Sequence, residues 1–269
     1  MKITTRNARF QQWQSLLANR NKRQRAGEFL VQGVRPITLA LERGWPLRAL
    51  LYADGARLSR WAAETLDTAP RGTDRIAMAP ELLAELSERD EADAELVAVV
   101  ETPPDDLGRL DVPDDFLGVL LDRPTSPGNV GSIIRSADAF GAHGVVVTGH
   151  AADVYDPKSV RASTGSLFAL PAVRVGSPRE VTDWLEAHPA VQVLGTDEQG
   201  ATRLQDAELT GPVLLLVGNE TTGLSSFWRE RADAMLSIPI RGAASSLNAA
   251  NAATTVLYEA ARQRGTDDR

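Results

Sequence analysis

The 269-residue sequence contains no cysteine. This absence excludes a disulfide framework, a thiol nucleophile and a cysteine-ligated zinc site. Histidine is scarce as well, because the chain has only His143, His150 and His188, and no two of them stand four residues apart. A pair of histidine ligands on one helix face needs that spacing. We therefore expect no metal site.

Long apolar runs are also missing. No stretch approaches the roughly 20 apolar residues that span a bilayer. The first six residues, MKITTR, lack the apolar region of a signal peptide. We expect a cytoplasmic protein with no membrane partner. The hydrophobic fraction of 43% still suffices for one large domain or two ordinary ones.

Charge is unevenly distributed along the chain. The net charge is −7, yet residues 1–35 contain eight lysine and arginine residues against Glu28 alone. Phe10 and Trp13 lie among these charges, and a basic segment with aromatic residues suits a phosphate backbone. The alternative is a solvated helix whose arginines serve solubility. We predict RNA contacts from six basic residues of this segment: Arg6, Arg9, Arg20, Lys22, Arg23 and Arg25.

Residues 1–100 alternate helical and extended patterns, which indicates a small α/β domain. We expect helices at 10–26, 36–43, 59–66 and 80–88, and strands at 28–33, 47–52, 76–78 and 96–100. The acidic run 88–95 is expected to form an exposed loop.

A polar, proline-bearing connection at 101–115 marks a domain boundary. We expect an amino-terminal domain at 1–105, a linker at 106–113 and a second domain at 114–269. The second domain opens with the apolar run 116–121, which is typical of a strand buried on both faces. Its other expected elements are strands at 144–148, 191–195 and 213–217 and helices at 130–140, 157–163, 178–187 and 246–263.

A polar loop bounded by two glycines, residues 218–225, follows the apolar run 213–217. Strands that end in such loops build the ligand crevice of an open α/β sheet. The glycine spacing is that of a phosphate-binding P-loop, but Leu224 and Ser225 stand where that motif needs lysine and serine or threonine. Glu220 would also repel phosphate. The loop therefore favours a neutral or cationic ligand.

A second loop, residues 122–135, leaves the first buried strand and opens a helix. Gly128 and Gly131 allow the backbone to approach a ligand closely, and the amides at a helix start favour an anion. The Gly-x-x-Gly spacing alone is weak, because ordinary turns share it. It also lacks one glycine of the dinucleotide-binding fingerprint. Taken by itself, this loop is either a ligand site or only a helix cap.

Three segments together are more specific: residues 129–135, 218–224 and 238–248. In order and spacing they resemble the signature motifs of the SpoU/TrmH branch of the SPOUT methyltransferases, which methylate ribose 2′-hydroxyls of RNA. Residues 5–33 resemble the RNA-binding extension of that family. Segments 7–13 and 151–158 are most similar to the avilamycin-resistance ribosomal RNA methyltransferases.

The resemblance implies a carboxyl-terminal, trefoil-knotted SPOUT domain with a mostly parallel sheet, preceded by a smaller amino-terminal α/β RNA-binding domain. It implies S-adenosylmethionine as cofactor and a homodimer that completes the active site. Ribosomal RNA is the expected partner, with a large-subunit uridine as target. The matching cofactor-binding positions are Thr196, Gly218, Asn219, Ile238 and Leu247. The matching catalytic positions are Asn129, Arg135, Glu220, Ser246 and Asn248.

Several of these side chains permit more than one role. A guanidinium, whose pKa exceeds about 12, is rarely unprotonated. We therefore expect Arg135 to clamp phosphate and to stabilise the developing alkoxide rather than to act as the base. Glu220 either orients Asn129 and the loop amides or favours the sulfonium electrostatically. Ser246 and Asn248 are also common helix caps.

Three alternative functions stay open at this stage. The chain could be a tRNA 2′-O-methyltransferase or a base methyltransferase of the same superfamily. It could also be a catalytically silent RNA-binding or ribosome-assembly factor that keeps the fold.

Overall fold

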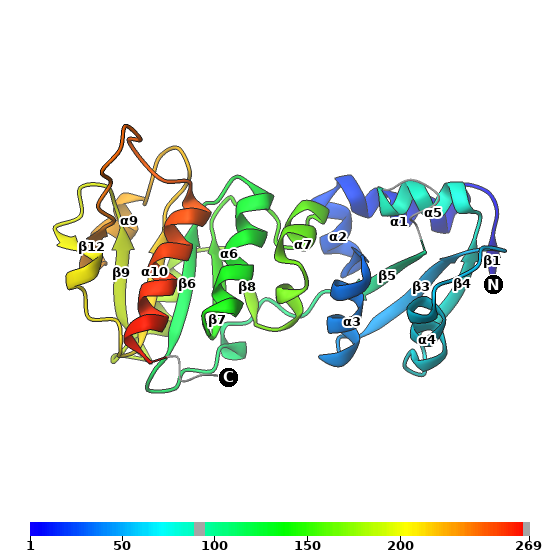
Figure 1. The fold of residues 1–269 in the computed structure, drawn as a ribbon, viewed down its shortest axis with the longest axis horizontal. Coiled ribbons are helices and arrows are strands. Elements are labelled where there is room, and N and C mark those ends of the chain that lie inside the picture. The colour runs from blue at the N-terminus through cyan, green and yellow to red at the C-terminus, as the bar shows by residue number, and fades with distance from the viewer. Residues whose placement is uncertain (89–94, 266–269) are drawn as a thin grey trace. The chain divides into compact units, whose positions relative to one another are not determined.

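The computed structural model describes residues 1–88 and 95–265, so most of the acidic run 88–95 lies outside the described residues. The chain forms two compact units (Figure 1). The first contains Met1–Pro103 together with Tyr155–Ala169, and the second contains Pro104–Val154 and Leu170–Arg269. The sequence places residues 155–169 in the domain 114–269, whereas in the structure this segment packs with the amino-terminal unit.

The first unit is built on a five-stranded sheet of order β1-β4-β3-β5-β2. β1, β4 and β3 run parallel, and β5 pairs antiparallel with β3 and β2. The strands are β1 (Lys2–Ile3), β2 (Glu28–Gln32), β3 (Leu47–Ala53), β4 (Asp74–Met78) and β5 (Leu96–Glu101). The helices are α1 (Ala8–Ala18), α2 (Arg20–Ala26), α3 (Val34–Glu42), α4 (Arg60–Thr68), α5 (Pro80–Ser87) and α7 (Pro157–Ser163), with the short turn η3 (Ser166–Phe168).

The single helix predicted at 10–26 is wrong, because the structure has two helices that meet at Asn19. The Asn19 backbone is extended, with φ −120° and ψ 103°, and its side chain accepts a hydrogen bond from the Lys22 amide. Asparagine is a preferred N-cap because its side chain satisfies an amide that the helix start leaves unpaired. This local bond ends α1 and begins α2.

Arg23 is buried at this junction, with 3% of its surface exposed. Its guanidinium donates to the carbonyl oxygens of Leu16 (2.6 Å) and Leu17 (3.2 Å) and contacts the Asp156 carboxylate at 3.4 Å. The carbonyls at the end of α1 thus gain a charged donor. The prediction that Arg23 contacts RNA is corrected, because its side chain holds α1, α2 and the start of α7 together.

The second unit is built on a seven-stranded, fully parallel sheet of order β10-β12-β9-β11-β6-β7-β8. The strands are β6 (Leu117–Asp122), β7 (Gly144–Thr148), β8 (Ala172–Val175), β9 (Gln192–Thr196), β10 (Thr202–Arg203), β11 (Val213–Val217) and β12 (Ala234–Ser237). The helices are α6 (Pro127–Ala139), α8 (Pro178–Glu186), α9 (Ser226–Arg229) and α10 (Ala249–Gln263), with turns η2 (Leu107–Arg109) and η4 (Leu204–Asp206). The predicted parallel α/β architecture is confirmed.

The central strands β6, β7 and β11 are buried at every residue. Such strands are covered by helices on both faces, which explains their unbroken apolar sequence. α6 and α10 lie side by side, and the hydroxyls of Ser136 and Thr254 are 2.7 Å apart between them (Figure 1). The short strands β1, β8, β10 and β12 were not expected, since their few residues give no long apolar run.

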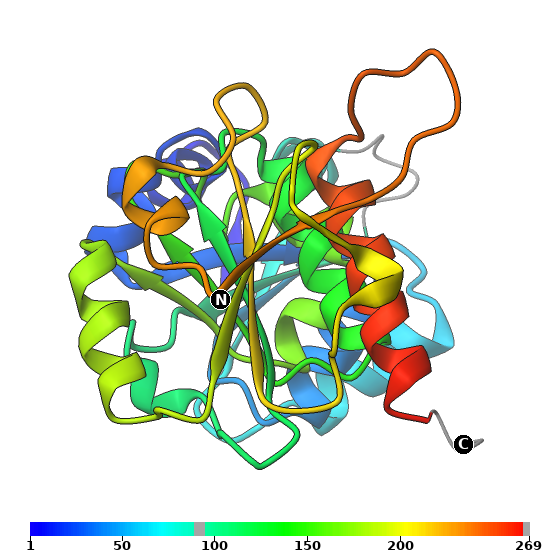
Figure 2. The same cartoon turned by 90° about the vertical axis from the view of Figure 1, so that its left-hand side faces the viewer.

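The carboxyl ends of β6, β11, β9 and β12 lie at one edge of the parallel sheet. In the view of Figure 2, the segment between β12 and α10 crosses these strands and returns through a long loop. α10 begins at Ala249 rather than at the predicted Ser246, because Asn248 is its N-cap and accepts from the Ala250 amide. None of the helices in residues 1–88 and 95–265 is long and apolar enough to cross a membrane.

Candidate active site

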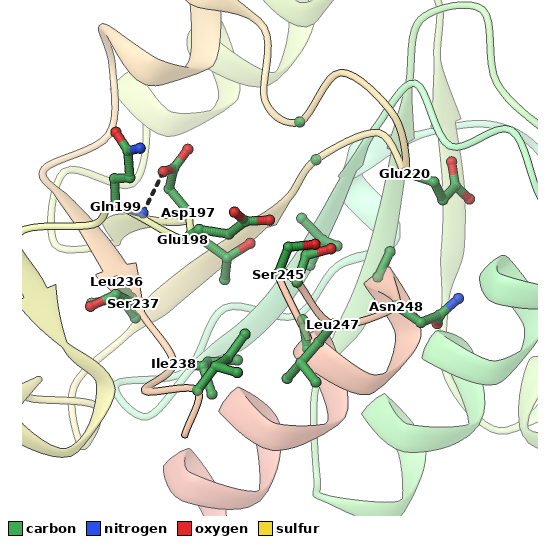
Figure 3. Close-up of a pocket in the computed structure, with 18 of the residues that line it drawn as sticks. Asp197, Glu198, Gln199, Glu220, Leu236, Ser237, Ile238, Ser245, Leu247 and Asn248 are labelled. Atoms are coloured by element: carbon green, nitrogen blue, oxygen red, sulfur yellow. Dashed lines mark hydrogen bonds between the residues drawn. The ribbon is translucent and has the colours of Figure 1, made fainter. Parts of the chain in front are cut away.

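A pocket of about 1090 Å³ opens at this edge (Figure 3). It is lined by the segments that follow β9, β11 and β12 and by the start of α10. Its volume lies slightly above the usual range of about 300–1,000 Å³ for small-molecule sites. All five residues predicted to bind the cofactor line it: Thr196, Gly218, Asn219, Ile238 and Leu247.

The loop after β11 forms a pocket wall made of backbone. Asn219 and Gly223 exchange two backbone hydrogen bonds of 3.1 and 3.0 Å, so the loop folds tightly on itself. A Cβ atom on Gly218 would lie 2.4 Å from the Gly223 carbonyl carbon and from the Leu224 nitrogen. Gly223 has a φ of +65°, which only glycine adopts at little cost. Both glycines are therefore required by the geometry of the loop.

Glu220 is fully engaged by the neighbouring loop. Oε2 accepts from the Thr125 amide (2.9 Å) and hydroxyl (2.8 Å), and Oε1 accepts from the Ser126 amide (3.1 Å) and from Nδ2 of Asn129 (3.1 Å). Burial by itself raises the pKa of the Glu220 carboxyl, but the bonds from the Thr125 amide and the other donors outweigh it and lower the pKa from 4.5 to about 2. These contacts are the ones expected for the first of its two roles, in which Glu220 orients Asn129 and the loop amides.

Asn129 joins the Glu220 loop to the start of α10. Its side-chain oxygen accepts from Nδ2 of Asn248 at 3.2 Å, while Oδ1 of Asn248 caps α10 through the Ala250 amide. Three of the predicted catalytic side chains, far apart in sequence, therefore form one polar chain. Ser246 lines the pocket. In Figure 3, Glu220 and Asn248 lie on one side of the pocket and Asp197 and Gln199 on the other.

Arg135 is the predicted catalytic residue that neither lines the pocket nor joins this hydrogen-bond network. It lies on α6, its side chain is exposed, and it is not among the residues that line the pocket. Within one chain, the structure does not bring Arg135 to the predicted cofactor site.

Asp122 and Arg123 complete the loop bracing, and the sequence prediction missed them. Asp122 is 1% exposed and accepts from the Ser225 amide at 2.7 Å and from the Arg123 guanidinium at 3.1 Å. Arg123 has a φ of +53°, and its carbonyl accepts from Nδ2 of Asn219 at 2.7 Å. Each loop thus gives a carboxylate to the amides of the other. The sequence signal that could have identified Asp122 is its position as the one charged residue of the apolar strand β6.

Acidic side chains beyond β9 were also missed. Asp197 and Glu198 line the pocket, and Asp197 pairs with Arg229. The bond from the Gln199 amide is the main cause that lowers the pKa of the Asp197 carboxyl, burial opposes it, and Arg229 lowers it further. The pocket therefore combines carboxylates with apolar side chains such as Ile238 and Leu247. In the described part of the chain, no group of three potential ligand side chains could hold a metal ion.

The predicted RNA-binding residues differ in their environment. Arg6 pairs with Glu85, and Arg9 pairs with Asp74 at 2.6 Å. The side chains of Lys22 and Arg25 are exposed, and Arg20 is partly exposed.

Comparisons with known proteins agree with this architecture. Residues 117–258 match the SpoU rRNA Methylase family, and residues 7–98 match the SpoU L30e-like domain. A 23S rRNA (uridine(2479)-2′-O)-methyltransferase from Streptomyces viridochromogenes is 66% identical over 267 residues, which cover 98% of this chain and 92% of that protein.

Two solved structures are similar over nearly the full length. The SpoU methyltransferase AviRb from Streptomyces viridochromogenes, in complex with AdoMet, has a TM-score of 0.92 at 66% identity, covering 96% of this chain and 98% of that chain. An AdoMet-bound rRNA methyltransferase from Sinorhizobium meliloti has a TM-score of 0.86 at 31% identity, covering 97% of each chain.

The fold and the pocket define a two-domain methyltransferase architecture. The chain belongs to the SpoU rRNA methylase family. The family predicted from the three motifs is therefore confirmed, together with its amino-terminal extension.

Glu220→Gln tests the loop bracing through its pH dependence. Since the folded pKa of about 2 lies below the ordinary value of 4.5, the carboxylate stabilises the folded state above about pH 4.5, and this contribution is lost as the pH falls toward 2. We expect the thermal midpoint of E220Q to lie below that of the wild type near neutral pH, and the gap to narrow below about pH 4.5. Thermal scans across this range measure the gap; an unchanged gap in acid would contradict the assignment.

Proposed function

We propose that this protein is an S-adenosylmethionine-dependent ribose 2′-O-methyltransferase that acts on 23S ribosomal RNA, with a uridine as target. The observation that carries the proposal is that two of the three motif segments line one pocket, and that Asn129 of the third is hydrogen-bonded to Glu220 and Asn248 of the other two. The family and the 66% identical 23S rRNA methyltransferase support the same reaction and the same RNA.

The residues of the pocket fit the cofactor. Ile238 and Leu247 offer apolar surface for an adenine ring, and the backbone at Gly218 allows a close approach that a side chain would block. The carboxylates of Asp197 and Glu198 offer negative charge for the sulfonium and amino groups. When bound, S-adenosylmethionine supplies the methyl group for transfer to the ribose oxygen.

The protein's own contribution is mainly positioning. The bonds between Glu220 and residues 125–129 hold the two loops in one geometry, and Asn129 presents its amide beside them. Fixed geometry of this kind supplies much of the acceleration of a two-substrate reaction. Because all the oxygens of Glu220 already accept hydrogen bonds, Glu220 acts as a positioning residue rather than as the base. Arg135 stabilises the negative charge that develops on the ribose oxygen.

We propose that Arg135 acts on the pocket of a second subunit in a homodimer. Its exposure on α6, outside the pocket of its own chain, supports this arrangement. The crossing segment between β12 and α10 is proposed to form the trefoil knot. We also propose a cytoplasmic location and a resistance phenotype toward a ribosome-targeting antibiotic, since avilamycin-resistance methyltransferases resemble this chain.

The proposal is tested with purified protein, S-adenosylmethionine and transcripts of 23S rRNA and tRNA. We expect calorimetry to detect binding of the cofactor, and alkali-resistant linkages to form in 23S rRNA at a uridine. Methylation of tRNA alone, or of a base, would overturn the assignment of the substrate. No cofactor binding would indicate a catalytically silent RNA-binding factor.

A further inference from the structure

An ion pair at the N-cap of α7 links α7 to α2 within the amino-terminal unit, although 130 residues separate the two helices in sequence (Figure 1). The Asp156 carboxylate connects them. One of its oxygens contacts Arg23 of α2 at 3.4 Å, and the other accepts from the Lys158 amide of α7 at 2.9 Å. The buried Arg23 fixes this arrangement, because it also donates to the end of α1.

Exposed side chains of both helices carry positive charge. Lys22 and Arg25 of α2 and Lys158 of α7 are exposed, and none of the three makes an ion pair with any residue in 1–88 or 95–265. Neither helix contains an acidic residue. Asp156 is engaged by Arg23, and Arg161 of α7 is paired with Glu88. We call Lys22, Arg25 and Lys158 the α2–α7 surface.

Exposed positive charges without carboxylate partners are available to an anionic ligand, which gains most from several of them at once. Polyanions are the matching ligands, since each neutralised phosphate releases a counterion. We infer that the α2–α7 surface binds the phosphate backbone of RNA, with Lys158 as a contact. This inference rests on the proposed function and adds to it. It adds a residue from outside the basic amino-terminal segment to the RNA-binding surface, because Lys158 lies between β7 and β8 in sequence.

The chain offers an internal control, because Lys2, Lys22 and Lys158 are its only lysines. Lys2 is exposed and pairs with Asp54. It lies on β1, at the edge of the sheet opposite to β2, and β2 is the strand that α2 and α7 contact. The full-length protein is acetylated briefly with and without a 23S rRNA transcript, and the three lysines are quantified by mass spectrometry. We expect RNA to slow acetylation of Lys22 and Lys158 several-fold, and that of Lys2 little.

A second measurement uses Lys158→Ala, with Lys2→Ala as the matched control. Each phosphate contact contributes about one to the slope of log affinity against log salt concentration. We expect Lys158→Ala to reduce this slope by about one and Lys2→Ala to leave it unchanged.

The outcomes separate this inference from the proposed function. If RNA is bound and methylated while Lys158 reacts as freely as without RNA, the inference fails and the proposed function stands. If Lys22 and Lys158 are both protected but no methyl group is transferred, the inference stands and the proposed function fails. If the protein binds no RNA at all, both fail.

Discussion

Arg135→Ala is expected to lower kcat for methyl transfer by about 10²–10³-fold, because removal of one donor to a developing oxyanion typically has this effect. Binding of S-adenosylmethionine should stay within about twofold of the wild type. The reason is that Arg135 does not line the pocket of its own chain. Methyl incorporation into a 23S rRNA transcript and calorimetry with the cofactor measure the two quantities.

Arg179→Ala is the matched control, since Arg179 is an exposed arginine on another helix of the same unit. It should retain the activity of the wild type. If R135A kept full activity, or lost cofactor binding in parallel with activity, the assigned role would be wrong.

Mixing two inactive variants tests the proposed homodimer. A protomer with R135A keeps its pocket, and a protomer with a disabled pocket keeps Arg135. If the arginine serves the partner's pocket, mixed dimers regain one working site, or roughly a quarter of the wild-type activity for an equal mixture. If the arginine serves its own chain, the mixture stays inactive.

Gly218→Ala should disable the pocket. The added Cβ would lie 2.4 Å from backbone atoms of Gly223 and Leu224, so the loop must move. Forced repacking of this kind costs about 1–3 kcal/mol, which corresponds to roughly 5–150-fold weaker cofactor binding if the cost falls on the bound geometry. Calorimetry with S-adenosylmethionine measures the affinity, and thermal unfolding measures the remaining stability.

Gly211→Ala is the control for this change. A Cβ at Gly211 meets no atom within 4 Å, and the residue precedes the same strand, β11. We expect its cofactor affinity and thermal midpoint to match the wild type. Wild-type affinity in G218A would show that the loop tolerates a side chain and that its backbone does not form the cofactor wall.

Much of the fold was predictable because buried strands have apolar sequences that can be recognised locally. The apolar runs 116–121, 144–148 and 213–217 predicted the central strands β6, β7 and β11, since strands covered on both faces exclude most polar residues. The break at Asn19 and the start of α10 at Ala249 were missed. Both depend on one side-chain bond at a cap, which periodicity does not register.

The candidate site was predictable as a set of residues but not as a set of roles. The five positions predicted to bind the cofactor line one pocket. The saturation of Glu220 was not visible, because its donors Thr125 and Ser126 lie 95 and 94 residues away. The burial of Arg23 was not visible either. Its charge predicted a contact with RNA, but in the structure it is buried and contacts Asp156, which lies 133 residues away in sequence.

The sequence by itself determined the parallel α/β sheet, the family and the loops that meet at the crevice, because apolar runs, glycines and motif spacing are local properties of the chain. Only the tertiary structure decided which polar groups satisfy one another. It made Glu220 a brace between loops, left Arg135 outside the pocket of its own chain, and joined residues 155–169 to the amino-terminal unit. Hydrogen bonds and ion pairs act only over a few ångströms, so their partners are set by the folded path of the chain and not by order along it.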